Sequence, residues 1–169
     1  QMNAAFESMS ALRQILEVTR KLAAPFDLDT MLSAVVDASR EVLNADRGTV
    51  FLYEEASDEL VVRVGTGLEN IRIPADKGIV GESAKSRKLI NVPDCYADSR
   101  FNRSIDKQTG YKSRCMLTIP LVGYEDTLVG VLQILNKNDG VFDEHDEFVS
   151  QALAAQAAVV IHRAKITEA

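Results

Sequence analysis

Apolar residues recur at steps of three and four along the first part of the chain, a spacing that predicts amphipathic helices. Pro25 divides the pattern into two helices, and Asp27 or Asp29 is placed to cap the second one. The residues that follow the spacing are Leu12, Ile15, Leu16, Leu22, Leu28, Met31, Leu32, Val35, Val36, Val42 and Leu43.

A third long helix is expected near the C-terminus. The stretch from about Glu144 to Lys165 is rich in Ala, Leu and Val and contains no Gly or Pro. Asp143 occupies the N-cap position, and Asp146 and Glu147 place negative charge at the positive end of the helix dipole.

Between these helices, short β-branched and alternating runs predict strands. Residues 48–54 and 59–64 form one expected hairpin, and residues 114–122 and 128–135 form a second. Residues 89–92 are a short extended piece between the two hairpins. Two hairpins framed by helices indicate an α+β domain, with an antiparallel central sheet and helices packed on it.

The long terminal helices run to both ends of the chain, and each must bury an apolar stripe. A second copy of the chain is the simplest partner, so we expect a homodimer through these helices; a single-chain bundle under the sheet is the alternative. The abrupt ends suggest that residues 1–169 are a single domain cut from a longer regulatory protein.

Composition excludes several classes of protein. The 169 residues are 46% hydrophobic and 26% charged, which is typical of a globular domain. The formal net charge of −6 argues against a nucleic-acid partner, and no apolar run is long enough for a membrane span. Cys95 and Cys115 lie outside any CxxC motif, which argues against a metal site and fits a reducing cytoplasm.

The charge is unevenly distributed. Residues 85–114 contain eight basic and three acidic side chains, a net charge of +5, so the rest of the chain carries −11. This basic segment is either a solvated surface or the surroundings of a small anion.

Two central stretches carry candidate binding chemistry. In residues 71–87, Gly78 and Gly81 flank Ile79 and Val80 where a helix is expected to open, and the free N–H groups of a first helical turn can hold an anion. Residues 98–113 are polar and offer hydrogen-bonding groups for a small ligand; the candidates are Asp106, Thr109 and Ser113. An ordinary turn and an ordinary surface loop are the alternatives.

These stretches, together with an Asn-Lys, Phe and Asp-Glu pattern that follows them, closely resemble GAF domains. The similarity covers about residues 28–162 and is greatest to the GAF domains of cyclic-nucleotide phosphodiesterases and cyanobacterial-type adenylyl cyclases. The residues of this signature are Asn136, Lys137, Phe142, Asp146 and Glu147. The resemblance implies a structural role for them: Lys137 at a strand end pairs with Asp146, and Phe142 fills the corner between them.

The resemblance also implies a sensor that needs no cofactor and binds cAMP or cGMP against the sheet, beneath the two central segments. Ile79 and Val80 would approach the cyclic phosphate through their backbone. The side chains expected to contact the nucleotide are Thr49, Asp106, Thr109, Ser113 and Gln133. Ligand binding would then change the arrangement of the terminal helices.

One departure from the family bears on the choice of base. Similar phosphodiesterase domains carry an aromatic residue and then an acid at the end of the second strand, where this chain has Gly65 and Thr66. A carboxylate accepts hydrogen bonds from guanine, whereas the hydroxyl of Thr66 can donate or accept and so also suits adenine. We therefore expect cAMP to be favoured over cGMP.

Other functions fit the sequence less well. A GAF module for dimerisation or protein interaction, without cyclic-nucleotide binding, is the main alternative. Methionine sulfoxide reduction would need more cysteines than Cys95 and Cys115, and neither cysteine has the following His typical of a bilin site. His145 and His162 are expected in solvent rather than on haem, and we find no hydrolase motif, so we expect a regulatory domain and not an enzyme.

Overall fold

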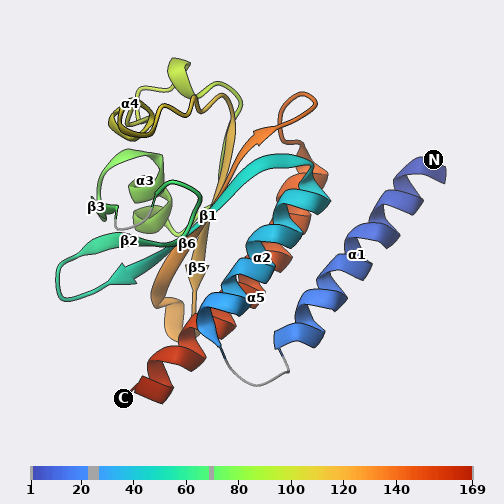
Figure 1. The fold of residues 1–169 in the computed structure, drawn as a ribbon, viewed down its shortest axis with the longest axis horizontal. Helices are drawn as coiled ribbons and strands as arrows, with labels where there is room; N and C mark the ends of the chain where they lie inside the picture. Colours follow the sequence, from blue (N-terminus) through green and yellow to red (C-terminus); the bar gives the residue numbers. More distant parts are fainter. Residues whose placement is uncertain (1, 23–26, 69–70, 169) are drawn as a thin grey trace.

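The computed structural model describes residues 2–22, 27–68 and 71–168. In this part of the chain, a six-stranded sheet separates two layers of helices (Figure 1). The strands are β1 (Ala45–Glu54), β2 (Glu59–Val64), β3 (Arg72–Pro74), β4 (Ile90–Val92), β5 (Met116–Val122) and β6 (Leu128–Lys137). The α-helices are α1 (Met2–Leu22), α2 (Leu28–Leu43), α3 (Gly78–Ser86), α4 (Ser104–Thr109) and α5 (Glu144–Glu168).

The sheet is antiparallel and has the order β3-β2-β1-β6-β5-β4. The β1–β2 and β5–β6 hairpins were both predicted, and the α+β fold is confirmed. Most strand boundaries agree with the prediction; β1 begins earlier, at Ala45, and β6 ends later, at Lys137, because these two residues pair with each other, and β5 begins later, at Met116. The edge strand β3 was not predicted, because it is only three residues long and ends in Pro74.

Side chains alternate between the two faces of the sheet and build a core on each. Val50 and Leu132 face α2 and α5, where they are fully buried with residues such as Leu32 and Leu153. Phe51 and Val131 face the opposite side and pack near α3. Helix α1 packs outside α2 and α5, and none of the described helices is apolar over a length that could cross a membrane (Figure 1).

The N-caps predicted for α5 and α2 can be compared with the structure. At α5, the N-cap is confirmed: Asp143 Oδ1 accepts the Asp146 N–H at 2.8 Å, and the Asp143 N–H donates to Asp146 Oδ2 at 3.0 Å. This bond to the Asp146 N–H lowers the pKa of Asp143. At α2, Asp27 is the N-cap residue and accepts the Thr30 hydroxyl, and Asp29 lies in the first turn. Pro25 lies outside the described residues.

The signature residues are structural in this chain. Lys137 at the end of β6 pairs with Asp146 in the first turn of α5, as predicted, and both side chains are largely buried, with 17% and 7% exposed. Phe142 is buried in the core between them. Asn91 of β4 donates both to the Phe142 carbonyl and to Glu147 Oε2, each at 2.9 Å, so Glu147 holds the far edge of the sheet to α5.

We expect Lys137→Ala to lower the free energy of unfolding by about 3 kcal/mol, because it leaves the buried Asp146 carboxylate without its cation. At roughly 2–4 °C per kcal/mol for a domain of this size, the melting midpoint should fall by on the order of 10 °C. Lys88→Ala, which removes an exposed ammonium, is the matched control in the thermal melt. Equal midpoints for the two variants would show that the pair contributes nothing to stability.

Candidate ligand pocket

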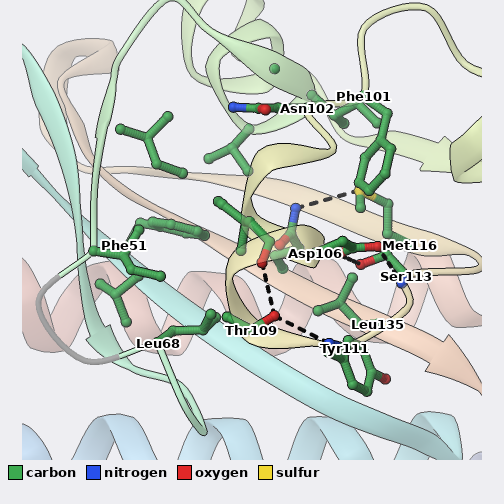
Figure 2. Close-up of a pocket in the computed structure, with 18 of the residues that line it drawn as sticks. Phe51, Leu68, Phe101, Asn102, Asp106, Thr109, Tyr111, Ser113, Met116 and Leu135 are labelled. Carbon is green, nitrogen blue, oxygen red and sulfur yellow. Dashed lines mark hydrogen bonds between the residues drawn. The ribbon is translucent and has the colours of Figure 1, made fainter.

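The face of the sheet opposite α2 and α5 carries a pocket beneath α3 and α4 (Figure 2). Its volume, including the opening to solvent, is about 700 Å³. One wall is apolar, and the rest mixes backbone and polar side chains. The apolar wall comes from β1, β2, β3 and the segment after β2, and contains Phe51, Val62, Leu68, Ile71 and Ile73.

The start of α3 opens into this pocket. Gly78 has a left-handed φ of +71°, which favours glycine, and a Cβ on Gly81 would lie only 2.7 Å from the Asp76 carbonyl carbon, so Gly81 leaves no room for a side chain. In the described part of the chain, the N–H groups of Gly78, Ile79 and Val80 make no hydrogen bond. With Lys77 beside them, they form an electropositive end of the pocket, as the sequence predicted for Ile79 and Val80.

The roof of the pocket is residues 95–114, which we call the lid. Its two ends are joined by a hydrogen bond from the Cys95 N–H to the Arg114 carbonyl, at 2.8 Å. The lid contains α4, which places Asp106 and Thr109 toward the sheet, and the following turn, which places Ser113 beside Asp106 (Figure 2).

The carboxylate of Asp106 holds the lid together. It accepts the Ser113 N–H at 2.7 Å, the Ser113 hydroxyl at 2.8 Å and the Tyr96 hydroxyl at 2.7 Å. The bond from Tyr96 raises the pKa of that phenol, which favours the protonated donor. Asp106 and Ser113 are both buried and both line the pocket, but their hydrogen-bonding groups are used mainly on each other.

Thr109 is also engaged within the lid. Its hydroxyl donates to the Ile105 carbonyl at 2.8 Å and accepts the Tyr111 N–H at 3.3 Å (Figure 2). The three lid residues chosen from the sequence therefore do reach the pocket together. In this structure they stabilise its roof, and their contact with a ligand stays a prediction.

Asn136 fastens the lid to the sheet. It follows the buried part of β6 in a left-handed conformation, with φ +58°. Its amide Oδ1 accepts the N–H groups of Arg114 and Cys115, at 2.6 and 3.1 Å. Its Nδ2 donates to the Tyr111 hydroxyl and the Lys112 carbonyl, at 2.8 and 2.9 Å. The whole hydrogen-bonding capacity of this side chain is thus spent at the base of the lid.

Tyr111 makes a second attachment between the lid and the sheet. Its hydroxyl donates to Asp46 Oδ2 at 2.7 Å, and the guanidinium of Arg47 lies 3.9 Å from the centre of its ring. Burial and the bond to Asp46 raise the pKa of Tyr111, so the phenol stays a donor at neutral pH. Both Arg47 and Tyr111 line the pocket.

The sheet contributes Gln133 and Thr49, which are neighbours across β6 and β1. Gln133 lines the pocket and is 8% exposed, with its Nε2 at 3.4 Å from both Met116 Sδ and Thr118 Oγ1. Thr49 is buried on the same face, beneath the segment after β2: a Cβ on Gly65 would lie 3.1 Å from its Cγ2. Thr49 therefore lies beside the pocket rather than on its surface.

Two expectations need correction. Thr66 is exposed and lines a separate depression between α2 and the β1–β2 end of the sheet, so the structure does not bring it to the pocket. The basic segment 85–114 does not surround the site either. Among the described residues that line the pocket, the cations are Arg47 and Lys77, both outside that segment.

Basic residues of the lid are used locally. Arg100 pairs with Asp98, and Arg103 lies over the ring of Tyr96, 4.8 Å from its centre. Arg114 donates to the carbonyl of Gly140 at 3.0 Å. The interpretation of residues 85–114 as a solvated surface is therefore the correct one.

Arg47, Lys77 and Tyr111 also line the pocket, although the sequence did not predict them there. Arg47 could have been found, because it stands two and four positions before Thr49 and Phe51 and so shares their face of β1. Lys77 directly precedes the glycine that opens α3. Tyr111 gave no comparable signal, since its position depends on how the lid folds back onto Asn136.

The cysteines and histidines do not form a reactive centre in the described residues. Cys95 and Cys115 are fully buried, and burial raises the pKa of the Cys95 thiol to about 12, so it stays protonated. His162 packs edge-on against Tyr124, with ring centres 5.0 Å apart. Across the described residues, no cluster of His, Cys, Asp and Glu has a geometry that could hold a metal ion.

Asp106→Asn should loosen the lid, because an amide offers one acceptor oxygen to three donors that now share two. We expect the Ser113 amide to exchange with solvent roughly 10–100 times faster, which corresponds to about 1–3 kcal/mol for the lost bonds. Hydrogen exchange measured by NMR gives the rate at this position. Asp94→Asn, an exposed carboxylate just before the lid, is the control; wild-type protection of Ser113 in both variants would contradict the role given to Asp106.

Comparison with known proteins agrees with this architecture. A cGMP-specific 3',5'-cyclic phosphodiesterase of Drosophila ananassae is 32% identical over 173 residues, which cover 90% of this chain and 15% of that protein. A probable 3',5'-cyclic phosphodiesterase of Caenorhabditis elegans, pde-5, is 30% identical over 167 residues, covering 90% of this chain and 23% of that protein. The chain thus spans less than a quarter of either relative.

Solved structures support the same fold. The GAF domain of a phosphoenolpyruvate-protein phosphotransferase from Coxiella burnetii superposes with a TM-score of 0.86 at 23% identity, over 95% of this chain and 97% of that one. The sequence model described as "GAF domain" matches residues 27–161, from the N-cap of α2 into α5. The chain therefore belongs to the GAF domain family.

Proposed function

We propose that this domain is a regulatory sensor that binds a cyclic nucleotide in the pocket beneath the lid. The observation that carries the proposal is the start of α3, where Lys77 and three residues with unbonded N–H groups line the cavity. A cyclic phosphate carries one negative charge and accepts hydrogen bonds, and it suits such a helix start. The apolar wall around Phe51 and Leu68 offers a surface for the base.

The same pocket favours adenine over guanine. Guanine presents a ring N–H and an amino group side by side, and a carboxylate is the best acceptor for that pair. Among the described lining residues, Asp106 carries the one carboxylate, and three hydrogen bonds within the lid already occupy it. The amide of Gln133 can both donate and accept, as adenine requires. We therefore propose cAMP as the preferred ligand, on residues of this chain rather than on the names of its relatives.

Signalling would pass through a homodimer formed by the terminal helices. Three large apolar side chains lie exposed along α1 at steps of three and four: Met9, Leu12 and Leu16, with 64%, 56% and 59% of their surfaces exposed. This is the spacing of a coiled-coil seam. On α5, Phe148 and Val159 are exposed as well, at 73% and 65%.

We further propose that the domain works in the cytoplasm, as part of a longer protein whose output domain responds to the helices. Its two buried thiols suit a reducing compartment. The exposed apolar stripe of α1 would also serve an interaction module that binds no ligand. That second function would leave the pocket empty, and nucleotide binding separates the two.

Addition of cAMP to protein that has been unfolded and refolded, to remove retained nucleotide, should raise the melting midpoint. Ligand at a hundred times its dissociation constant stabilises the folded state by about 2.7 kcal/mol, which corresponds to roughly 5–10 °C here. We expect a smaller rise with cGMP. A rise with cGMP alone would refute the preference for cAMP, and no rise with either nucleotide would favour the interaction module.

Two lysines of α3 and its N-cap supply the matched control for this melt. Lys77→Gln removes the charge at the pocket and should weaken cAMP binding about two- to five-fold. Lys85→Gln removes the same charge from the last turn of the helix and should leave the affinity unchanged. Equal losses would mean that the anion does not lie at the start of α3.

Leu12→Lys should shift the protein from dimer to monomer, because it places a charge in the apolar stripe of α1 that we propose as the dimer interface. Light scattering after size-exclusion chromatography measures the mass directly. Ser10→Lys adds the same charge to α1 outside this apolar stripe and should leave a dimer. Dimers from both variants would exclude this face of α1 as the interface.

A further inference from the structure

The mouth of the pocket can be located from the exposure of the residues that line it. Among the described lining residues, nearly all are buried or half-buried, and Lys77 and Asn102 are the two that are exposed. Lys77 directly precedes α3, and Asn102 lies in the lid, on the far side of the cavity from Tyr111 (Figure 2). The solvent therefore reaches the pocket where the lid meets the start of α3.

This junction, which we call the seam, has no directional bonds. A Cβ on Gly78 would lie 3.6 Å from Asn102 Cβ and 3.8 Å from the Arg100 carbonyl oxygen, so the space between the two segments is no wider than a side-chain contact. Throughout the described residues, no hydrogen bond or ion pair joins residues 98–109 to α3. Apolar contacts close the seam, with Phe101 in the cluster of Ile79 and Ile105 in that of Val80, and Glu82 of α3 attracts Arg100 of the lid across it without an ion pair.

The opposite end of the lid is attached to the sheet by several hydrogen bonds. Asn136 makes four hydrogen bonds to residues 111–115, and Tyr111 adds one to Asp46. Inside the lid, Asp106 joins Tyr96 to Ser113, and the two ends are bonded to each other. These hydrogen bonds hold the lid together and attach one end of it to the sheet. The edge at α3 can open more easily, because apolar contacts separate without leaving buried polar groups unpaired.

We propose that ligands enter and leave through the seam between Gly78 and Asn102, where the lid swings away from α3 while its other end stays fixed at Asn136 and Tyr111. The route places Lys77 at the entrance, so an anionic ligand meets this cation first. The inference rests on the proposed function for the identity of the ligand, but the motion itself is a property of the free domain.

A disulfide across the seam tests the route. The 3.6 Å separation of the two Cβ positions is within the range for a disulfide, so the double variant Gly78→Cys/Asn102→Cys can be closed with oxidised glutathione and reopened with a reductant. Cys95 and Cys115 are buried and should not compete. Because φ at Gly78 is +71°, the substitution is strained, and the oxidised protein is compared with its own reduced form, which carries the same strain.

With tritiated cAMP bound before oxidation, we expect its release to slow by roughly 100-fold or more and to recover on reduction, since the bridge prevents the opening motion. Equal release rates in the two forms would overturn the proposed entrance. If wild-type protein does not bind cAMP at all, the proposed function fails, and the motion is then tested without a ligand.

Hydrogen exchange supplies that second measurement. The amides of Ile79 and Val80 make no hydrogen bond and belong to buried residues behind the seam, so opening of the seam should speed their exchange. In the free wild-type domain we expect them to exchange faster than the amides of Arg114 and Cys115, which are bonded to Asn136. The disulfide should slow Ile79 and Val80 alone. Faster exchange at Arg114 and Cys115 would show that the lid opens at its sheet end, and would refute the proposal.

Discussion

The amide of Asn136 is the constraint on which the rest of the site depends. Its four hydrogen bonds all go to the base of the lid, and the left-handed backbone turns the chain out of β6 at the same point. The next residue, Lys137, pairs with Asp146 at the start of α5. Two adjacent residues thus join the ligand side of the sheet to the helix side. A movement of the lid at Asn136 is therefore one peptide bond away from the residue that contacts α5.

The distribution of bonds explains how a buried pocket can still exchange its contents. A lid fastened on all sides would trap its ligand, and a lid fastened nowhere would cost too much conformational entropy to order. Here the hydrogen bonds gather around Asn136 and Asp106, whereas the edge near Phe101 is held by apolar contact. Apolar contacts are non-directional and reform readily, which suits the edge that must move.

The fold alone does not decide what the domain senses, because one architecture can host unrelated sites. The assignment depends instead on particular groups in the pocket. Unbonded N–H groups at α3 favour an anion, and the apolar wall around Phe51 favours a planar base. The engaged carboxylate of Asp106 removes the acceptor that guanine would use best. Each of these groups belongs to this chain, so the proposed ligand rests on the chemistry of the chain's own residues.

The long helices, both hairpins and the pairing of Lys137 with Asp146 could be predicted from the sequence, because these follow from local periodicity and from short spacings. It also pointed to Ile79 and Val80 at a helix start. The folded structure was needed to see that Thr66 lines a different depression, that Arg47 and Lys77 are the cations among the described lining residues, and that Asp106 binds Ser113 and Tyr96. Those outcomes depend on where the segment after β2 turns and how the lid folds back on Asn136. The attachment of Tyr111 to Asp46 and Asn136 joins residues far apart in the chain, which no local pattern encodes, whereas strand alternation does carry a signal for Arg47.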